Sequence, residues 1–112
     1  MNVLRRSVAL ALLLAAGQAA AQGLPGDAAR GRTIAEHWCG ECHEVAPEIR
    51  DQWEGEPPPF QVIADHPATT ELALRAFLQT PHANMPDLQP TPEDTDDLIA
   101  YLLTLKGHEP GT

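Results

Sequence analysis

Cys39, Cys42 and His43 are the residues in this chain whose types and spacing indicate chemistry. They lie in the stretch WCGECH, which contains both cysteines of the 112-residue sequence. Two thiols separated by two residues are typical of dithiol oxidoreductases, in which the first thiol lies at the start of a helix. The same pair followed directly by a histidine is typical of covalent haem attachment. The surrounding sequence has to decide between these two kinds of site.

The dithiol interpretation fits the surrounding sequence poorly. It requires a buried strand that leads into the first cysteine, whereas the residues before Cys39 read RGRTIAEH, a charged pattern with helical spacing. A structural zinc site needs a second pair of ligands, and the chain has no further cysteine. A disulfide across so short a loop would stabilise the fold little. The dithiol and zinc sites therefore remain minor alternatives.

Covalent haem attachment accounts for the whole motif. The thiols of Cys39 and Cys42 would each bond one vinyl group of haem c, and His43 would then bind the iron from the proximal side. A second iron ligand is expected from the loop-rich half of the chain, where Met85 lies between prolines in PHANMPDL. A methionine is ordinarily a core residue, but the motif favours Met85 as the distal ligand, because His/Met ligation is known for c-type haems. We predict one covalently bound haem.

The N-terminus has the pattern of a secretory signal peptide. Arg5 and Arg6 precede the apolar run VALALLLAA, and the small residues at 19–21 fit a cleavage site. We expect a signal peptide over residues 1–21, with an uncleaved membrane anchor as the alternative, and one small domain over residues 22–112. Covalent haem attachment takes place outside the cytoplasm, so motif and signal together predict a periplasmic protein that is not inserted in the membrane after cleavage.

The hydrophobic pattern predicts an all-α domain with three or four short helices. Apolar residues recur at three- and four-residue steps over 27–38, 70–80 and 92–106, and 60–64 is a further short helix. Trp38 is interpreted as the last apolar position of the first of these helices. Thr91 followed by Pro92 is typical of a helix start. The proline-rich stretches between the helices are predicted to be ordered loops wrapped round the haem, which would supply the missing core.

The chain is acidic, with a formal net charge of −9 at pH 7 that becomes more negative if the signal peptide is removed. This charge excludes nucleic acid as a partner, because phosphates need a basic face, and it argues against anionic lipid surfaces. A protein partner recognised through this field would carry a basic patch. Simple solubility explains the charge equally well.

Together these segments resemble the class I c-type cytochromes, small mono-haem electron carriers. The resemblance spans essentially the whole domain and rests on GRTIAEHWCGECH, PPPF, NMP and DLIAYLLTL. It implies the small cytochrome c fold, in which Gly31 lets the first helix approach the last, with Tyr101 packed over it. It also implies that a proline carbonyl accepts the Nδ1–H of His43 and orients the ring. Pro58 is the expected residue, with its two proline neighbours as near alternatives.

The resemblance further implies an electron-transfer protein and not an enzyme, a monomer that carries single electrons between larger redox proteins. One alternative is a cytochrome subunit of a periplasmic dehydrogenase or oxidase. Another is a haem sensor or enzyme with an open distal position, in which Met85 is packing. Two further roles stay open: Trp53 either contacts a haem propionate or packs in its loop, and His82 either faces solvent or replaces Met85 as ligand when the loop opens. The chain lacks the lysine-rich face of some members, so their docking mode is not carried over.

Overall fold

The computed structural model describes residues 23–47, 54–55, 57–81 and 84–108. Within these residues the chain is helical and has no strand, which confirms the predicted all-α fold. The elements are α2 (Ala28–Ile34), a π-helical turn η2 that continues it (Ala35–Cys39), α3 (Phe60–Asp65), α4 (Glu71–Leu78) and α5 (Pro92–Thr104). The expected signal peptide, Trp53 and His82 lie outside the described residues.

The helices begin where local capping signals place them. The side chain of Thr91 accepts a hydrogen bond from the amide of Asp94 at 3.1 Å, and Pro92 occupies the first position of α5, as the sequence predicts. The carboxylate of Asp27 caps α2 in the same way, and the hydroxyl of Thr70 caps α4. These caps satisfy backbone amides that have no partner inside the helix.

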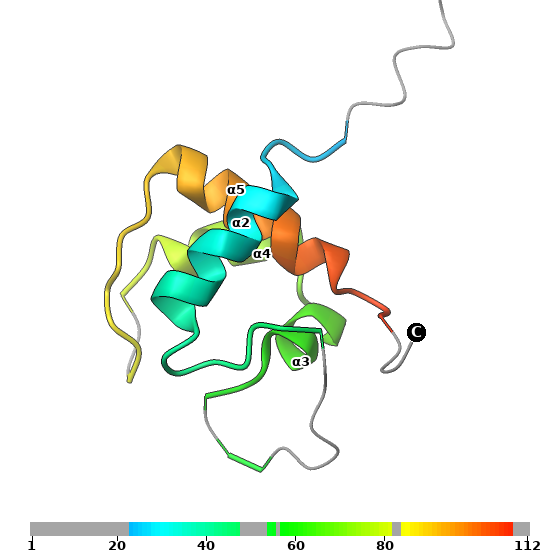
Figure 1. Ribbon diagram of the computed structural model, residues 1–112, viewed down its shortest axis with the longest axis vertical. Helices are drawn as coiled ribbons and strands as arrows, with labels where there is room; N and C mark the ends of the chain where they lie inside the picture. The colour runs from blue at the N-terminus through cyan, green and yellow to red at the C-terminus, as the bar shows by residue number, and fades with distance from the viewer. Residues whose placement is uncertain (1–22, 48–53, 56, 82–83, 109–112) are drawn as a thin grey trace, which may run out of the picture.

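Helix α5 is the centre of the fold, because α2, α3 and α4 all contact it. Figure 1 shows α2 crossing α5, with the π-helical turn leading away from the crossing. A Cβ placed on Gly31 would lie 1.9 Å from the carbonyl oxygen of Asp97 and 3.0 Å from the Cβ of Tyr101. Only glycine therefore allows the two helices to approach this closely, and the expected packing of Gly31 against Tyr101 is confirmed.

Charged side chains hold the same crossing together. The guanidinium of Arg30 in α2 donates to the carboxylates of Glu93, Asp94 and Asp97 in α5, at 2.8, 3.0 and 2.8 Å. Asp97 is buried, and its second carboxylate oxygen accepts from the backbone amide of Asp27 at 2.6 Å. A buried carboxylate needs such partners to offset its lost hydration. The first turn of α2 is therefore fixed against the first turns of α5.

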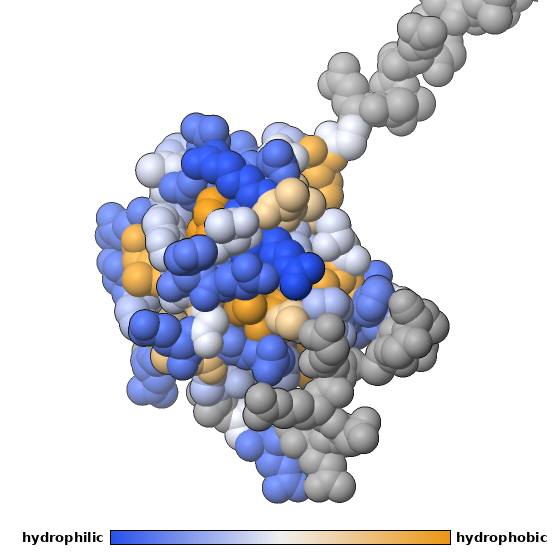
Figure 2. All heavy atoms as spheres, viewed as in Figure 1, coloured by the Kyte–Doolittle hydropathy of each residue, from blue (hydrophilic) through white to orange (hydrophobic). Residues whose placement is uncertain are grey.

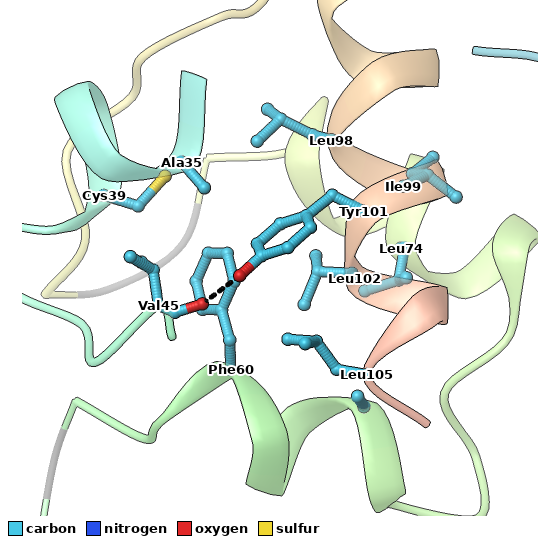
Figure 3. Packing of buried hydrophobic residues seen from close by; sticks show 11 residues of the cluster. Ala35, Cys39, Val45, Phe60, Leu74, Leu98, Ile99, Tyr101, Leu102 and Leu105 are labelled. Atoms are coloured by element: carbon cyan, nitrogen blue, oxygen red, sulfur yellow. Dashed lines mark hydrogen bonds between the residues drawn. The ribbon is translucent and has the colours of Figure 1, made fainter. Parts of the chain in front are cut away.

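The core between these helices is small. Its members come from the π-helical turn, α3, α4, α5 and the segment after the cysteine motif, and five of the eleven lie on α5 or just beyond its end (Figure 3): Ala35, Cys39, Val45, Phe60, Ala64, Leu74, Leu98, Ile99, Tyr101, Leu102 and Leu105. Figure 2 shows hydrophilic side chains over most of the outer face, with smaller hydrophobic areas between them. Among the described residues, no helix is long and apolar enough to cross a membrane.

The first helix buries Gly31 and Ala35 of the apolar row that the sequence pattern indicates, but the row ends at Cys39 and not at Trp38. Gly31, Ala35 and Cys39, each four residues apart, face the core, whereas Trp38 is 45% exposed. The prediction that Trp38 ends the buried stripe is therefore wrong. Trp38 is adjacent to the buried row of Gly31, Ala35 and Cys39 on the helix surface. Its apolar side chain fits the helical spacing in the sequence but does not face the core.

Candidate functional site

The cysteine motif forms a tight turn directly after a helix end. The amide of Gly40 donates to the carbonyl of Ala35 at 2.9 Å, and the amides of Cys42 and His43 both donate to the carbonyl of Cys39, at 3.1 and 2.8 Å. A Cβ on Gly40 would lie 2.6 Å from the carbonyl oxygen of Glu36, so this position of the motif also requires glycine. The turn thus depends on Gly40, one of the two residues between the cysteines.

The two thiols differ in their surroundings. Cys39 is buried and Cys42 is exposed, and both are free. Burial raises the pKa of the Cys39 thiol, and Cys39 ends a helix rather than beginning one. A dithiol oxidoreductase needs the opposite arrangement, in which a helix N-terminus lowers the pKa of the first thiol. The local structure therefore argues against the dithiol alternative.

His43 is held in a defined orientation. Its Nδ1 lies 2.6 Å from the carbonyl oxygen of Pro58, and its ring packs against Phe60 with centroids 5.5 Å apart at 58°. Because a carbonyl oxygen can only accept, Nδ1 carries a proton, and in the tautomer of the neutral imidazole that this bond selects, Nε2 is the nitrogen with the lone pair. Pro58, rather than either neighbouring proline, supplies this carbonyl. A neutral imidazole with a free Nε2 is the form that binds metal.

Met85 lies in an apolar pocket beside Cys39. The pocket has an empty volume of about 420 Å³, part of it open to solvent, and is formed by the end of the π-helical turn, the end of α4, the loop before α5 and Leu98 of α5. Trp38 and Leu88 line it and are 45% and 44% exposed. The structure therefore brings Met85 together with Cys39. His43 is not one of the residues that line this pocket.

These residues fit a covalently bound haem. Two free thiols lie within one turn of an imidazole whose Nε2 is left for a metal, and a thioether lies in the apolar pocket that one of those thiols lines. Imidazole nitrogen and thioether sulfur are both known axial ligands of haem iron. A large planar apolar group in this pocket would also cover Trp38 and Leu88, which are otherwise large apolar side chains in contact with water.

A known protein is similar to this chain in sequence. The chain is 30% identical over 97 residues to the cytochrome c-552 of Bradyrhizobium diazoefficiens, an alignment that covers 87% of this chain and 92% of that protein. The chain belongs to the c-type cytochromes. No family model matches this cytochrome, and no solved structure matches it. Membership implies covalently bound haem c and favours electron transfer over catalysis.

Two features of the site were not foreseen from the sequence of this cytochrome. One is the need for glycine at position 40, which no pattern marks. The other is the hydroxyl of Tyr101, which donates to the carbonyl of Val45, two residues after His43, at 2.5 Å. The residue type alone could have indicated the hydrogen bond of Tyr101, because a tyrosine at a core position usually has a hydrogen-bond partner for its hydroxyl.

Proposed function

We propose that this cytochrome is a mono-haem, His/Met-ligated carrier of the class I type that moves single electrons between larger redox proteins in the periplasm. The observation that carries the proposal is the hydrogen bond from His43 Nδ1–H to the Pro58 carbonyl. It fixes the tautomer that a proximal ligand needs and makes the ring a stronger donor.

Each residue of the site has a separate task in this proposal. Cys39 and Cys42 would anchor the haem covalently, and His43 and Met85 would supply ligands to its iron. When bound, the haem supplies a one-electron Fe(III)/Fe(II) couple. The apolar residues of the pocket would disfavour water beside Met85 and so favour the thioether over a water molecule as an iron ligand.

The distribution of charge supports a basic partner. Each of the four cations in the described residues is already held: Arg30 by acids of α5, Arg32 by Glu36, Arg75 by Glu71 and Asp96, and Lys106 by the carbonyl of Thr69. Exposed carboxylates also lie at the site itself, with Glu41 between the cysteines and Asp87 on the pocket. We propose that donor and acceptor present basic side chains to this acidic surface.

The test of the ligand set compares two substitutions on the same pocket. Met85→Ala should open a coordination position, so the ferric protein becomes high-spin and the ferrous protein takes up carbon monoxide. Leu88→Ala, the matched control, removes apolar volume from the same loop and should leave the low-spin spectrum unchanged. His82→Ala in the Met85→Ala background excludes replacement of the ligand by that histidine.

Two results would overturn parts of this proposal. Carbon monoxide uptake by the wild-type ferrous protein at neutral pH would favour the sensor or enzyme alternative, because a six-coordinate iron has no open position. Elution with a dehydrogenase or oxidase in size-exclusion chromatography of the native protein would favour the subunit alternative. A free carrier elutes as a monomer.

A further inference from the structure

The hydroxyl of Tyr101 connects α5 to the segment that carries His43. Tyr101 is 5% exposed, and its hydroxyl donates to the carbonyl oxygen of Val45, a buried hydrogen bond between residues 56 apart in the chain. Figure 3 shows the tyrosine ring extending from α5 across the core to this carbonyl. Both the hydroxyl and the carbonyl are buried and have lost their hydration. Removal of the hydroxyl would therefore destabilise the fold mainly because the Val45 carbonyl would lose its hydrogen-bond donor.

His43 is held from both sides along the chain. On its N-terminal side, its own amide donates to the carbonyl of Cys39 at 2.8 Å, within the motif turn. On its C-terminal side, the amide of Phe60 donates to the carbonyl of Glu44 at 2.8 Å, and Tyr101 donates to the carbonyl of Val45. The Phe60 and Pro58 contacts both come from one short segment. Tyr101 is the contact that comes directly from α5.

The position of α5 is itself fixed relative to the cysteines. The Cβ of Tyr101 lies 3.0 Å from where a Cβ on Gly31 would be, and the helix that contains Gly31 runs on to Cys39. One residue therefore touches the helix that ends in the first anchoring thiol and also holds the backbone two positions after the imidazole. Tyr101 therefore links the segment after His43 to the crossing of α2 and α5.

We infer that Tyr101 is a positioning residue for His43: its hydroxyl holds the Val45 carbonyl so that the imidazole stays on the Pro58 carbonyl, the orientation in which Nε2 would be available to the iron. The inference rests on the proposed role of His43 as an iron ligand. Without the hydroxyl, the Val45 carbonyl is left buried without this donor, which destabilises the closed state. Opening of segment 43–45 to water then costs less free energy. Opening of this segment breaks the His43–Pro58 and Phe60–Glu44 hydrogen bonds together.

The test is Tyr101→Phe in the reduced holoprotein, which keeps the ring and removes only the hydroxyl. Hydrogen exchange by NMR follows the Nδ1–H of His43 and the amide of Phe60, which report opening of segment 43–45. The amide of Leu74, which donates to Thr70 within α4 at 3.0 Å, reports global unfolding. The expected result is a two- to tenfold faster exchange of the first two protons relative to Leu74, equivalent to about 0.4–1.4 kcal/mol.

A second readout is the midpoint potential. A weaker hydrogen bond from Nδ1–H makes the imidazole a poorer donor, which should raise the potential in Tyr101→Phe. Thr69→Val is the matched control, because it removes another hydroxyl-to-carbonyl bond, from Thr69 to Ile63 at 2.6 Å, away from the haem ligands. It should leave the potential and the His43 proton unchanged.

The outcomes separate this inference from the proposed function. Equal acceleration of all three protons, or no acceleration, would mean that Tyr101 is a purely structural residue and would overturn the positioning role alone. A His43→Ala holoprotein that keeps the wild-type low-spin spectrum would overturn the ligand assignment, and the inference with it. Selective acceleration together with a raised potential supports both.

Discussion

Gly31→Ala tests the helix crossing with the smallest possible change in side chain. The added Cβ would lie 1.9 Å from the carbonyl oxygen of Asp97 and 2.5 Å from its carbonyl carbon. Contacts of a Cβ below 3.0 Å essentially never occur, so the backbone of α5 has to move away from α2 by roughly an ångström. That movement also lengthens the hydrogen bonds that Asp97 accepts from Arg30 and from the amide of Asp27.

The expected loss of folding free energy is that of overpacking the helix crossing. Overpacking a core costs about 1–3 kcal/mol, and a rigid backbone contact lies at the upper end of that range. A loss of about 3 kcal/mol in a domain of this size lowers the melting temperature by about 12–24 °C. The assay is thermal unfolding of the holoprotein, followed by circular dichroism.

The matched control is Gly23→Ala, because a Cβ at Gly23 meets no atom within 4 Å. This substitution should change the free energy of unfolding by no more than an ordinary surface substitution does, about 0.5 kcal/mol, and should therefore shift the melting temperature little. A Gly31→Ala protein that melts together with Gly23→Ala would refute the close approach of α2 to α5. The contact of Tyr101 with Gly31, which connects α5 to the helix that leads to Cys39, would then be refuted as well.

Three further predictions concern the anchors, the distal ligand and a pH-dependent contact. Cys39→Ser with Cys42→Ser should leave the chain largely unfolded by circular dichroism, because covalent haem contributes folding free energy; a well-folded, haem-free helical protein would contradict this. Met85→His should lower the midpoint potential in redox titration while the iron stays low-spin, since a thioether favours Fe(II); an unchanged potential would exclude Met85 as the ligand. Hydrogen bonds, first from Gln61 and then from the Gly107 amide, lower the pKa of Asp65. The stabilisation they give is present above the unfolded pKa of about 3.9 and is lost as the pH falls through the lower folded value. Urea unfolding should therefore show Asp65→Asn as destabilised near neutral pH only, and an equal loss in strong acid would contradict the ionic origin.

The local features of this cytochrome could be predicted from its sequence. Thr91 and Pro92 mark the start of α5 because capping involves residues within one turn of each other. The motif of Cys39, Cys42 and His43 predicted its chemistry because the ligand types and spacing are contiguous. The burial of Cys39 in place of Trp38 was not foreseen, since two adjacent positions at the edge of an apolar stripe look alike until the partner helix is in place.

The contacts that orient the site depend on the tertiary structure. Three adjacent prolines offer the same acceptor to His43, and only the path of the chain selects the carbonyl of Pro58. The bond from Tyr101 to Val45 joins residues 56 apart and ends on a backbone carbonyl. Every residue carries such a carbonyl, so no side chain marks which one will be used. The sequence alone therefore determined where the helices begin and which residues carry the chemistry, whereas the tertiary structure decided which backbone carbonyls hold the imidazole and the segment after it in place.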